Sequence, residues 1–199
     1  MGIRDRNIDA LRMQYIIHAD RFGFPSSTMI GDGPPTAVEF GATGYGHVNL
    51  VEAGKIAAVL DFQFCRLFDP TEEIGVRVFY GTQEVGSSTD DVEFIVQYDQ
   101  CDFGEVLVVP STALDTVVGV QTNVGGTTSE LKISSRGIID ANKFDFTART
   151  GAIAWEVEYQ ATSFANDKLG LFALALDYIP RVNESESENI DVFKDVSAA

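Results

Sequence analysis

The stretch that decides the fold is Ile153-Ala154-Trp155-Glu156-Val157-Glu158-Tyr159-Gln160. Its large apolar side chains occupy every second position, and its polar side chains lie between them. Successive side chains of a strand point to opposite faces, so this alternation predicts a β-strand with one face in a core. The later stretch 169–178 is almost continuously apolar. That pattern is typical of a strand that is central in its sheet or is covered by another subunit.

Similar patterns recur toward the N-terminus. Further strands are predicted near residues 56–68, 75–80, 92–98, 106–109, 116–120, 131–133 and 144–148. In the first of these, Phe62, Phe64 and Phe68 are predicted to share one face, and Asp61 and Gln63 the other. Turn-forming residues separate the strands, without helical periodicity, which argues against βαβ units. We therefore predict an all-β fold, an antiparallel β-sandwich of jelly-roll type.

The N-terminal segment carries the helix prediction. Asn7 is a suitable N-cap, and the apolar residues Ile8, Leu11, Tyr15 and Ile16 recur at helical spacing. The Gly-, Pro-, Ser- and Thr-rich stretch that follows is predicted to form an extended arm. An acidic, mobile tail is predicted at the C-terminus. The helix with its arm, the β-sandwich domain and the tail are expected at residues 1–46, 47–181 and 182–199.

The chain of 199 residues is strongly acidic, with 30 acidic and 14 basic side chains and a formal net charge of −16. Such a charge repels phosphates and anionic lipids, so we expect neither nucleic acids nor membranes as partners. The first residues contain no unbroken hydrophobic stretch, and nowhere do about 18 apolar residues follow one another. We therefore expect no signal peptide and no transmembrane helix, and synthesis in a cytoplasm.

No constellation of residues predicts catalysis. His18 and His47 lie far apart in the sequence, and neither accompanies a nucleophile motif or has the spacing of metal ligands. Glu156 and Glu158 share one face of a strand at a separation of about 7 Å. That separation falls between the two carboxylate geometries of glycosidases and selects neither. We therefore predict a protein without enzymatic activity, catalytic residues or a bound cofactor.

Metal binding is not predicted either. Cys65 and Cys101 both fall in predicted strands, where two free thiols acting as small apolar side chains are favoured over a disulfide. Two cysteines alone do not make a zinc site. Acidic clusters with oxygen ligands suited to calcium occur at Asp69, Glu72 and Glu73, at Asp90 and Asp91, and at Asp99 and Asp102. The calcium-loop pattern of an EF-hand is missing, and such clusters are common in an acidic chain.

Carbohydrate binding on a sandwich would require aromatic side chains exposed on a sheet face. Trp155 and Tyr159 share a face, but Ile153 and Val157 occupy it too, which predicts a core position. The remaining candidates, which the pattern does not assign to a surface, are Tyr45, Tyr80 and Tyr98. A carbohydrate-binding jelly roll, with or without calcium, therefore stands as an alternative.

Several features together carry a family resemblance: Arg6-Asn7-Ile8-Asp9, the Gly- and Pro-rich arm, the sandwich, and Leu174-Ala175-Leu176-Asp177-Tyr178-Ile179-Pro180-Arg181. In this layout the chain resembles virion structural proteins of tailed bacteriophages. The resemblance implies a capsid decoration (cement) protein that forms homo-oligomers, with a trimer favoured. It also implies contact with the major capsid protein or other virion proteins, and a location in the virion after synthesis in the host cytoplasm. A tail-tube protein or other virion component is the alternative within this resemblance.

Overall fold

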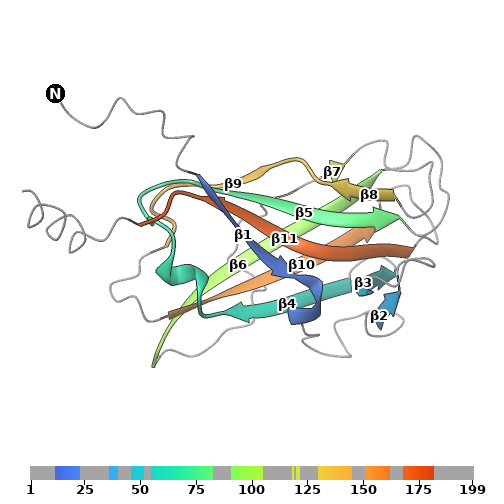
Figure 1. Cartoon of the computed structure of the whole chain (residues 1–199), viewed down its shortest axis with the longest axis horizontal. Coiled ribbons are helices and arrows are strands. Elements are labelled where there is room, and N and C mark those ends of the chain that lie inside the picture. Colours follow the sequence, from blue (N-terminus) through green and yellow to red (C-terminus); the bar gives the residue numbers. More distant parts are fainter. Residues whose placement is uncertain are drawn as a thin grey trace, which may run out of the picture.

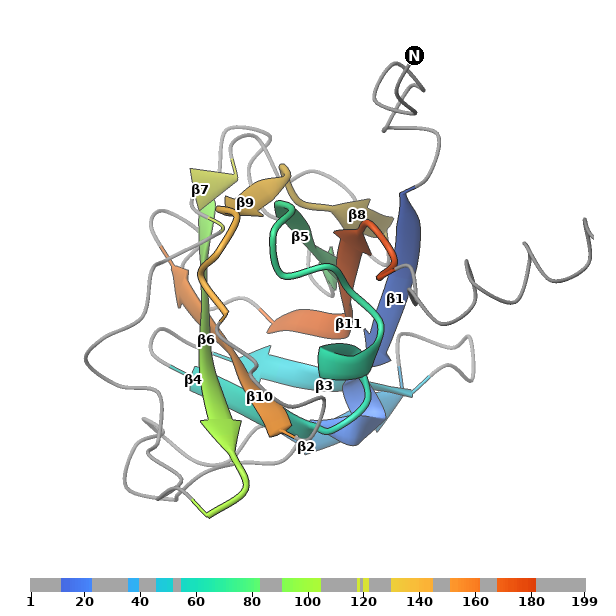
Figure 2. The same ribbon diagram turned by 90° about the vertical axis from the view of Figure 1, so that its left-hand side faces the viewer.

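The computed structural model describes residues 12–22, 36–39, 46–51, 55–82, 91–104, 118, 120–121, 130–144, 151–161 and 168–181. Over these residues the chain forms eleven strands in two antiparallel sheets, which confirms the predicted β-sandwich (Figure 1). The two sheets face each other as two layers (Figure 2). No helix in this described part of the chain is long and apolar enough to cross a membrane.

The smaller sheet has four strands in the order β4-β10-β6-β7. They are β4 (Lys55–Asp61), β6 (Val92–Asp102), β7 (Val120–Gln121) and β10 (Gly151–Ala161). β10 pairs with β6 along its whole length, from Gly151 opposite Asp102 to Ala161 opposite Val92. The other edge of β10 pairs with β4. The alternating stretch 153–160 therefore forms a middle strand of this sheet.

The larger sheet has seven strands, built around β11 (Lys168–Tyr178). The others are β1 (Met13–His18), β2 (Thr36–Glu39), β3 (Gly46–Val51), β5 (Ile74–Thr82), β8 (Glu130–Ile133) and β9 (Gly137–Ile139). β5 pairs with one edge of β11. β3 and β1 share the other edge, beside the first and second halves of the strand. The nearly continuous apolar sequence of β11 thus belongs to a central strand, one of its two predicted positions.

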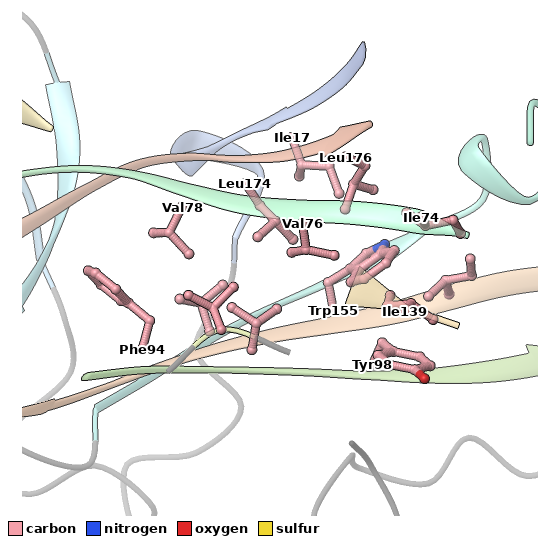
Figure 3. Close-up of a cluster of buried hydrophobic side chains, with 14 of the residues drawn as sticks. Ile17, Ile74, Val76, Val78, Phe94, Tyr98, Ile139, Trp155, Leu174 and Leu176 are labelled. Carbon is pink, nitrogen blue, oxygen red and sulfur yellow. The ribbon is translucent and has the colours of Figure 1, made fainter. Parts of the chain in front are cut away.

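The core lies between the inward faces of the two sheets. Trp155 and Tyr98, from the four-stranded sheet, point toward Ile74, Val76 and Leu176 of the seven-stranded sheet (Figure 3). Ile153, Trp155 and Val157 are all fully buried, as the alternation predicts. Burying each such side chain stabilises the fold by roughly 1.5–3 kcal/mol, so this strand contributes heavily to the stability of the sandwich.

The helix predicted at the N-terminus is not confirmed. Residues 13–18 form strand β1, which pairs antiparallel with β11, and residues 1–11 lie outside the described part. Ile17 is fully buried, whereas Ile16 is exposed, so burial follows a period of two here. Pairing with the central strand selects the strand here, because a short helix is marginal on its own whereas every residue of β1 is paired with β11. The predicted spacing of Tyr15 and Ile16 was compatible with either structure.

The predicted arm also differs from the structure over residues 36–39, which form β2 and pair with β3. The rest of residues 23–45 lies outside the described part. The strand predicted at 106–109 and the C-terminal tail at 182–199 lie outside it as well. The structure therefore leaves the predicted mobility of the tail as a prediction.

Candidate functional site

The outer face of the four-stranded sheet is built by alternate residues of three adjacent strands. On β10 the inward side chains of Ile153, Trp155 and Val157 leave Ala152, Ala154, Glu156 and Glu158 on the outer side. The register places Leu60 of β4 and Asp99 of β6 on either side of Ala154. It places Ala58 and Gln97 on either side of Glu156 in the same way. We call this surface the four-strand face.

The middle row of the four-strand face is buried, although it lies on the outer side of the sheet. Ala152 and Ala154 are buried, and Glu156 is only 3% exposed. Gln97 and Asp99 on β6 are half-buried. This row therefore consists of two small side chains followed by a carboxyl group, all of them shielded from water.

Two exposed aromatic rings mark one end of this face. Phe62 directly follows β4 and Phe103 directly follows β6, on either side of the beginning of β10. Their rings are nearly parallel, with an interplanar angle of 10° and centroids 6.2 Å apart. They are 45% and 68% exposed, respectively. Gly104 follows with a φ of 101°, a conformation that glycine adopts without strain and that ends the strand beside the ring.

A buried carboxylate holds Phe62 in place. Asp61 is fully buried and accepts hydrogen bonds from the backbone N–H groups of Gln63 (2.7 Å) and Phe64 (2.8 Å). It also accepts one from the Tyr15 hydroxyl at 2.7 Å and forms an ion pair with Arg21 at 3.3 Å. These two backbone bonds form an Asx turn that ends β4 and leads into the short 3-10 helix η4 (Phe64–Arg66), whose N-cap residue is Gln63. Asp61 therefore joins β1 of one sheet to β4 of the other.

This corner corrects the prediction for residues 60–68. The predicted single strand would have placed Phe62, Phe64 and Phe68 on one face. Instead Phe64 and Phe68 are buried while Phe62 is exposed, and the polar Asp61 is buried. The reason is the capping by Asp61, which breaks the period of two at this position. Phe62 and Phe103 are the site residues that sequence reasoning missed, and a Phe-Gly turn after an alternating strand was the available signal.

Glu156 has an unusual environment for a carboxyl group. Its Oε2 atom has no hydrogen-bond partner among the described residues. Burial, and secondarily the nearby charge of Glu158, raise the pKa of Glu156 to about 7. A carboxyl group of this kind can donate a hydrogen bond when protonated and accept several when ionised. The predicted pair Glu156 and Glu158 thus lies on one face, but only Glu156 is buried.

The sequence also singled out two cysteines, two histidines and several aromatic residues. Cys65 and Cys101 are free thiols, as predicted, and the Cys65 thiol donates to the carbonyl of Gly151 at 3.0 Å. Burial raises the pKa of Cys65. His18 is exposed on β1, and the side chain of His47 lies outside the description. Trp155, together with Tyr80 and Tyr98, is a core residue.

The acidic clusters do not converge on a cation among the described residues, where no group of three or more acidic, histidine or cysteine side chains could hold a metal ion. Asp69 instead closes a turn, accepting hydrogen bonds from the backbone and hydroxyl of Thr71. Glu73 forms ion pairs with Arg12 at 2.7 Å and Arg136 at 3.1 Å. Asp90 lies outside the described residues.

Comparison with known proteins gives matches only to solved structures. No protein-family model and no curated protein sequence matches the chain. The chain is similar to a xylan-binding module of family CBM15, with 10% identity over 85% of this chain and 100% of that one, at a TM-score of 0.47. It is similar to the CBM22-1–GH10 modules of xylanase 10B from Clostridium thermocellum, with 14% identity over 87% of this chain and 28% of that one, at a TM-score of 0.47. It is also similar to the Cry4Aa toxin of Bacillus thuringiensis, with 9% identity over 85% of this chain and 24% of that one, at a TM-score of 0.45.

Proposed function

We propose that this protein binds a carbohydrate chain on its four-strand face. The observation that carries the proposal is the placement of two exposed, parallel rings, Phe62 and Phe103, at the end of the rows that lead to Glu156. Ligand sites combine apolar and aromatic surface with a few well-placed polar groups. This face has both components: two exposed rings, and a buried carboxyl group whose Oε2 atom has no hydrogen-bond partner among the described residues.

The chemistry of a sugar suits both components. The C–H face of a pyranose ring is apolar and packs against an aromatic ring, while its hydroxyl groups both donate and accept hydrogen bonds. A buried polar atom without a partner among the described residues costs about 1–3 kcal/mol. Because Glu156 is only 3% exposed, a ligand hydroxyl reaches its Oε2 atom only when binding displaces the groups that bury it, and the hydrogen bond then recovers this cost. Gln97 and Asp99 beside the same row supply further donors and acceptors. Binding in this form requires no catalytic group.

Affinity electrophoresis tests the proposal. The purified chain is run in gels cast with xylan, mixed-linkage β-glucan, galactomannan or soluble starch, and any hit is quantified by calorimetry with the matching oligosaccharide. We expect retardation by at least one polysaccharide. Phe62→Ala and Phe103→Ala should each weaken that binding about tenfold, equivalent to about 1.4 kcal/mol of lost contact. Glu156→Gln should weaken it as well.

The matched control is Ile138→Ala, which truncates a half-exposed apolar side chain on the opposite sheet. It should leave the affinity unchanged. Absence of retardation by all four polysaccharides, or wild-type affinity in both phenylalanine variants, would contradict the proposal. Far-UV circular dichroism of each variant separates a lost contact from a lost fold.

The second candidate function is a structural role in a virion, either as a capsid decoration protein or as a tail-tube component. The specific observation in its favour is the apolar surface of the seven-stranded sheet, where Ile16, Leu131, Ile133 and Ile138 are exposed. Such surfaces suit contact between subunits. Light scattering and electron microscopy of the purified chain test this role. Isolated trimers favour a shell ornament and stacked rings favour a tube, whereas a monomer at all concentrations argues against both.

A further inference from the structure

The edge strand β8 presents an unusual combination of exposed apolar side chains and paired charges. It is the last strand in the order β2-β3-β11-β5-β8, and among the described strands it pairs only with β5. Leu131 and Ile133 are 63% and 45% exposed. Glu130 and Lys132, which alternate with them, form an ion pair at 2.7 Å. Proteins usually blunt an edge strand, because its free backbone groups can pair with another chain.

The hydrogen-bond pattern shows which residues of β8 face the free edge. Next to β8, the Ser134 N–H donates to the Val78 carbonyl of β5 at 2.9 Å. Backbone groups in an antiparallel ladder alternate in direction from residue to residue. Lys132 and Glu130, two and four residues earlier, therefore direct their N–H and C=O groups toward β5. Leu131 and Ile133 direct theirs away from it, toward the free edge.

This geometry is self-complementary. If a second copy of β8 pairs antiparallel with a two-fold axis at Leu131, each Leu131 exchanges two backbone hydrogen bonds with its counterpart. The same register puts Glu130 opposite Lys132 of the second copy, and Lys132 opposite Glu130. Those positions are the non-hydrogen-bonded pairs, in which facing side chains approach most closely. A register shifted by two residues would lose both charge pairs.

We propose that two copies of this protein associate through antiparallel pairing of their β8 strands, centred on Leu131. The contact extends the seven-stranded sheet from one protomer into the other and brings the two exposed leucine side chains together. Because Glu130 and Lys132 balance each other, the contact adds no charge repulsion of its own, although each chain carries a net charge of −16. The two-fold symmetry favours an even number of copies over the trimer that the family resemblance implies.

Light scattering coupled to size exclusion tests the pairing. The wild-type chain should have twice its chain mass of 21.7 kDa at micromolar concentration. Leu131→Pro removes an N–H group that points to the free edge and not to β5, so the protomer should remain folded while the dimer dissociates. Circular dichroism of this variant verifies the fold. A monomeric or trimeric wild-type mass, or a dimeric mass of the folded proline variant, would overturn the proposal.

A charge exchange makes the test specific for the register. Glu130→Lys alone, or Lys132→Glu alone, places like charges opposite each other twice in the dimer, and should raise its dissociation constant at least tenfold. The double variant Glu130→Lys/Lys132→Glu restores opposite charges and should restore the dimer. Dimers of wild-type strength in either single variant, or failure of the double variant to recover, would refute pairing in this register.

Discussion

The outer faces of the two sheets differ in how their polar groups are satisfied. On the four-strand face, the buried Glu156 has an oxygen without a partner among the described residues. On the seven-stranded sheet, Glu73 is bound by both Arg12 and Arg136. Asp177 on the same sheet accepts from Gln14 at 3.2 Å and lies 3.7 Å from Arg136. The first face thus has a carboxyl oxygen without a partner among the described residues, while the carboxylates Glu73 and Asp177 of the second are bound within the fold. The buried atom without a hydrogen-bond partner on the second sheet is a donor, Arg77 Nε, which lies 3.9 Å from Asp177.

The apolar groups of the two faces differ in the same sense. On the four-strand face the exposed apolar surface is concentrated in one pair of stacked rings, beside a row of small side chains. On the seven-stranded sheet it is spread over aliphatic side chains of three strands, at Ile16 of β1, Leu131 and Ile133 of β8, and Ile138 of β9. A concentrated aromatic platform suits a small ring-shaped ligand, whereas dispersed aliphatic groups suit another protein surface.

The largest effect is expected at the corner that presents the aromatic pair. Asp61→Ala leaves the N–H groups of Gln63 and Phe64 without their acceptor, and leaves the Tyr15 hydroxyl only its longer contact to Gln63 Oε1 at 3.3 Å. We expect a loss of about 3–5 kcal/mol in the free energy of unfolding, because one partner of a buried charged network is removed. Denaturation in urea measures the loss. The affinity of any bound polysaccharide should fall too, since Phe62 follows Asp61 directly.

Two controls sharpen this prediction. Asp61→Asn keeps an oxygen for the two N–H groups, but it loses the charge and replaces the acceptor of the Tyr15 hydroxyl by an NH2 group, so we expect a smaller loss of about 1–3 kcal/mol. Asp69→Ala removes the same residue type from an exposed turn, where it accepts from Thr71, and should cost no more than about 1 kcal/mol. Equal losses for Asp61→Ala and Asp69→Ala would show that the corner does not hold the two sheets together.

The next effect concerns Glu156 and depends on pH. The pKa of Glu156 is raised to about 7 from its ordinary value of 4.5, so the folded chain binds this proton more tightly than the unfolded chain does. Stability should therefore fall as the pH rises from about 4.5 through about 7, by on the order of 2 kcal/mol. Glu156→Gln removes the titrating group. We expect its melting temperature to exceed that of the wild type at pH 8 and to match it near pH 4.5.

Glu158→Gln is the control for this titration. It keeps Glu156 but removes the nearby charge that is the second cause of the raised pKa. The fall in stability should then persist but move to lower pH, because burial remains. Melting curves at half-unit pH intervals distinguish the two variants. A wild-type pH profile in Glu156→Gln would mean that another group titrates. The two faces would then not differ in the protonation of a buried carboxyl group.

The sandwich could be predicted from the sequence because its signal is local. The alternation around Trp155 and the apolar run of β11 each lie within one strand, and period two follows directly from backbone geometry. The segment around Tyr15 and Ile16 was mistaken for helix because only its pairing with β11, about 160 positions later, selects a strand.

The candidate site required contacts that no local pattern contains. Phe62 is exposed because Asp61 caps the turn after β4, and Asp61 is buried against Tyr15, which lies 46 residues away in the chain. The platform exists only because Phe62 meets Phe103. Similarly, the raised pKa of Glu156 depends on burial in the folded chain. Sequence could place Glu156 and Glu158 on one face, but it could not show which of them was shielded.

The smallest effect tests whether the seven-stranded face is structural. Arg136 crosses over Gly75 of β5 on its way to Glu73 and Asp177, and a Cβ atom at position 75 would overlap its guanidinium group. Gly75→Ala should therefore displace Arg136 and cost about 1 kcal/mol, the range of a partly exposed ion-pair network. Urea denaturation again gives the value. Polysaccharide affinity should be unchanged, because the four-strand face is on the other sheet.

The same substitution made in an Arg136→Ala variant decides whether overlap with Arg136 causes the loss of stability. In Arg136→Ala the space above Gly75 is empty, so adding a methyl group meets no obstacle. Alanine also loses less backbone entropy than glycine on folding, by about 0.5–1 kcal/mol. Gly75→Ala should then be neutral or stabilising in that background, which reverses its sign relative to the wild type. If it destabilises both backgrounds equally, the glycine serves the strand itself, and the ion pairs of this face are incidental to its packing.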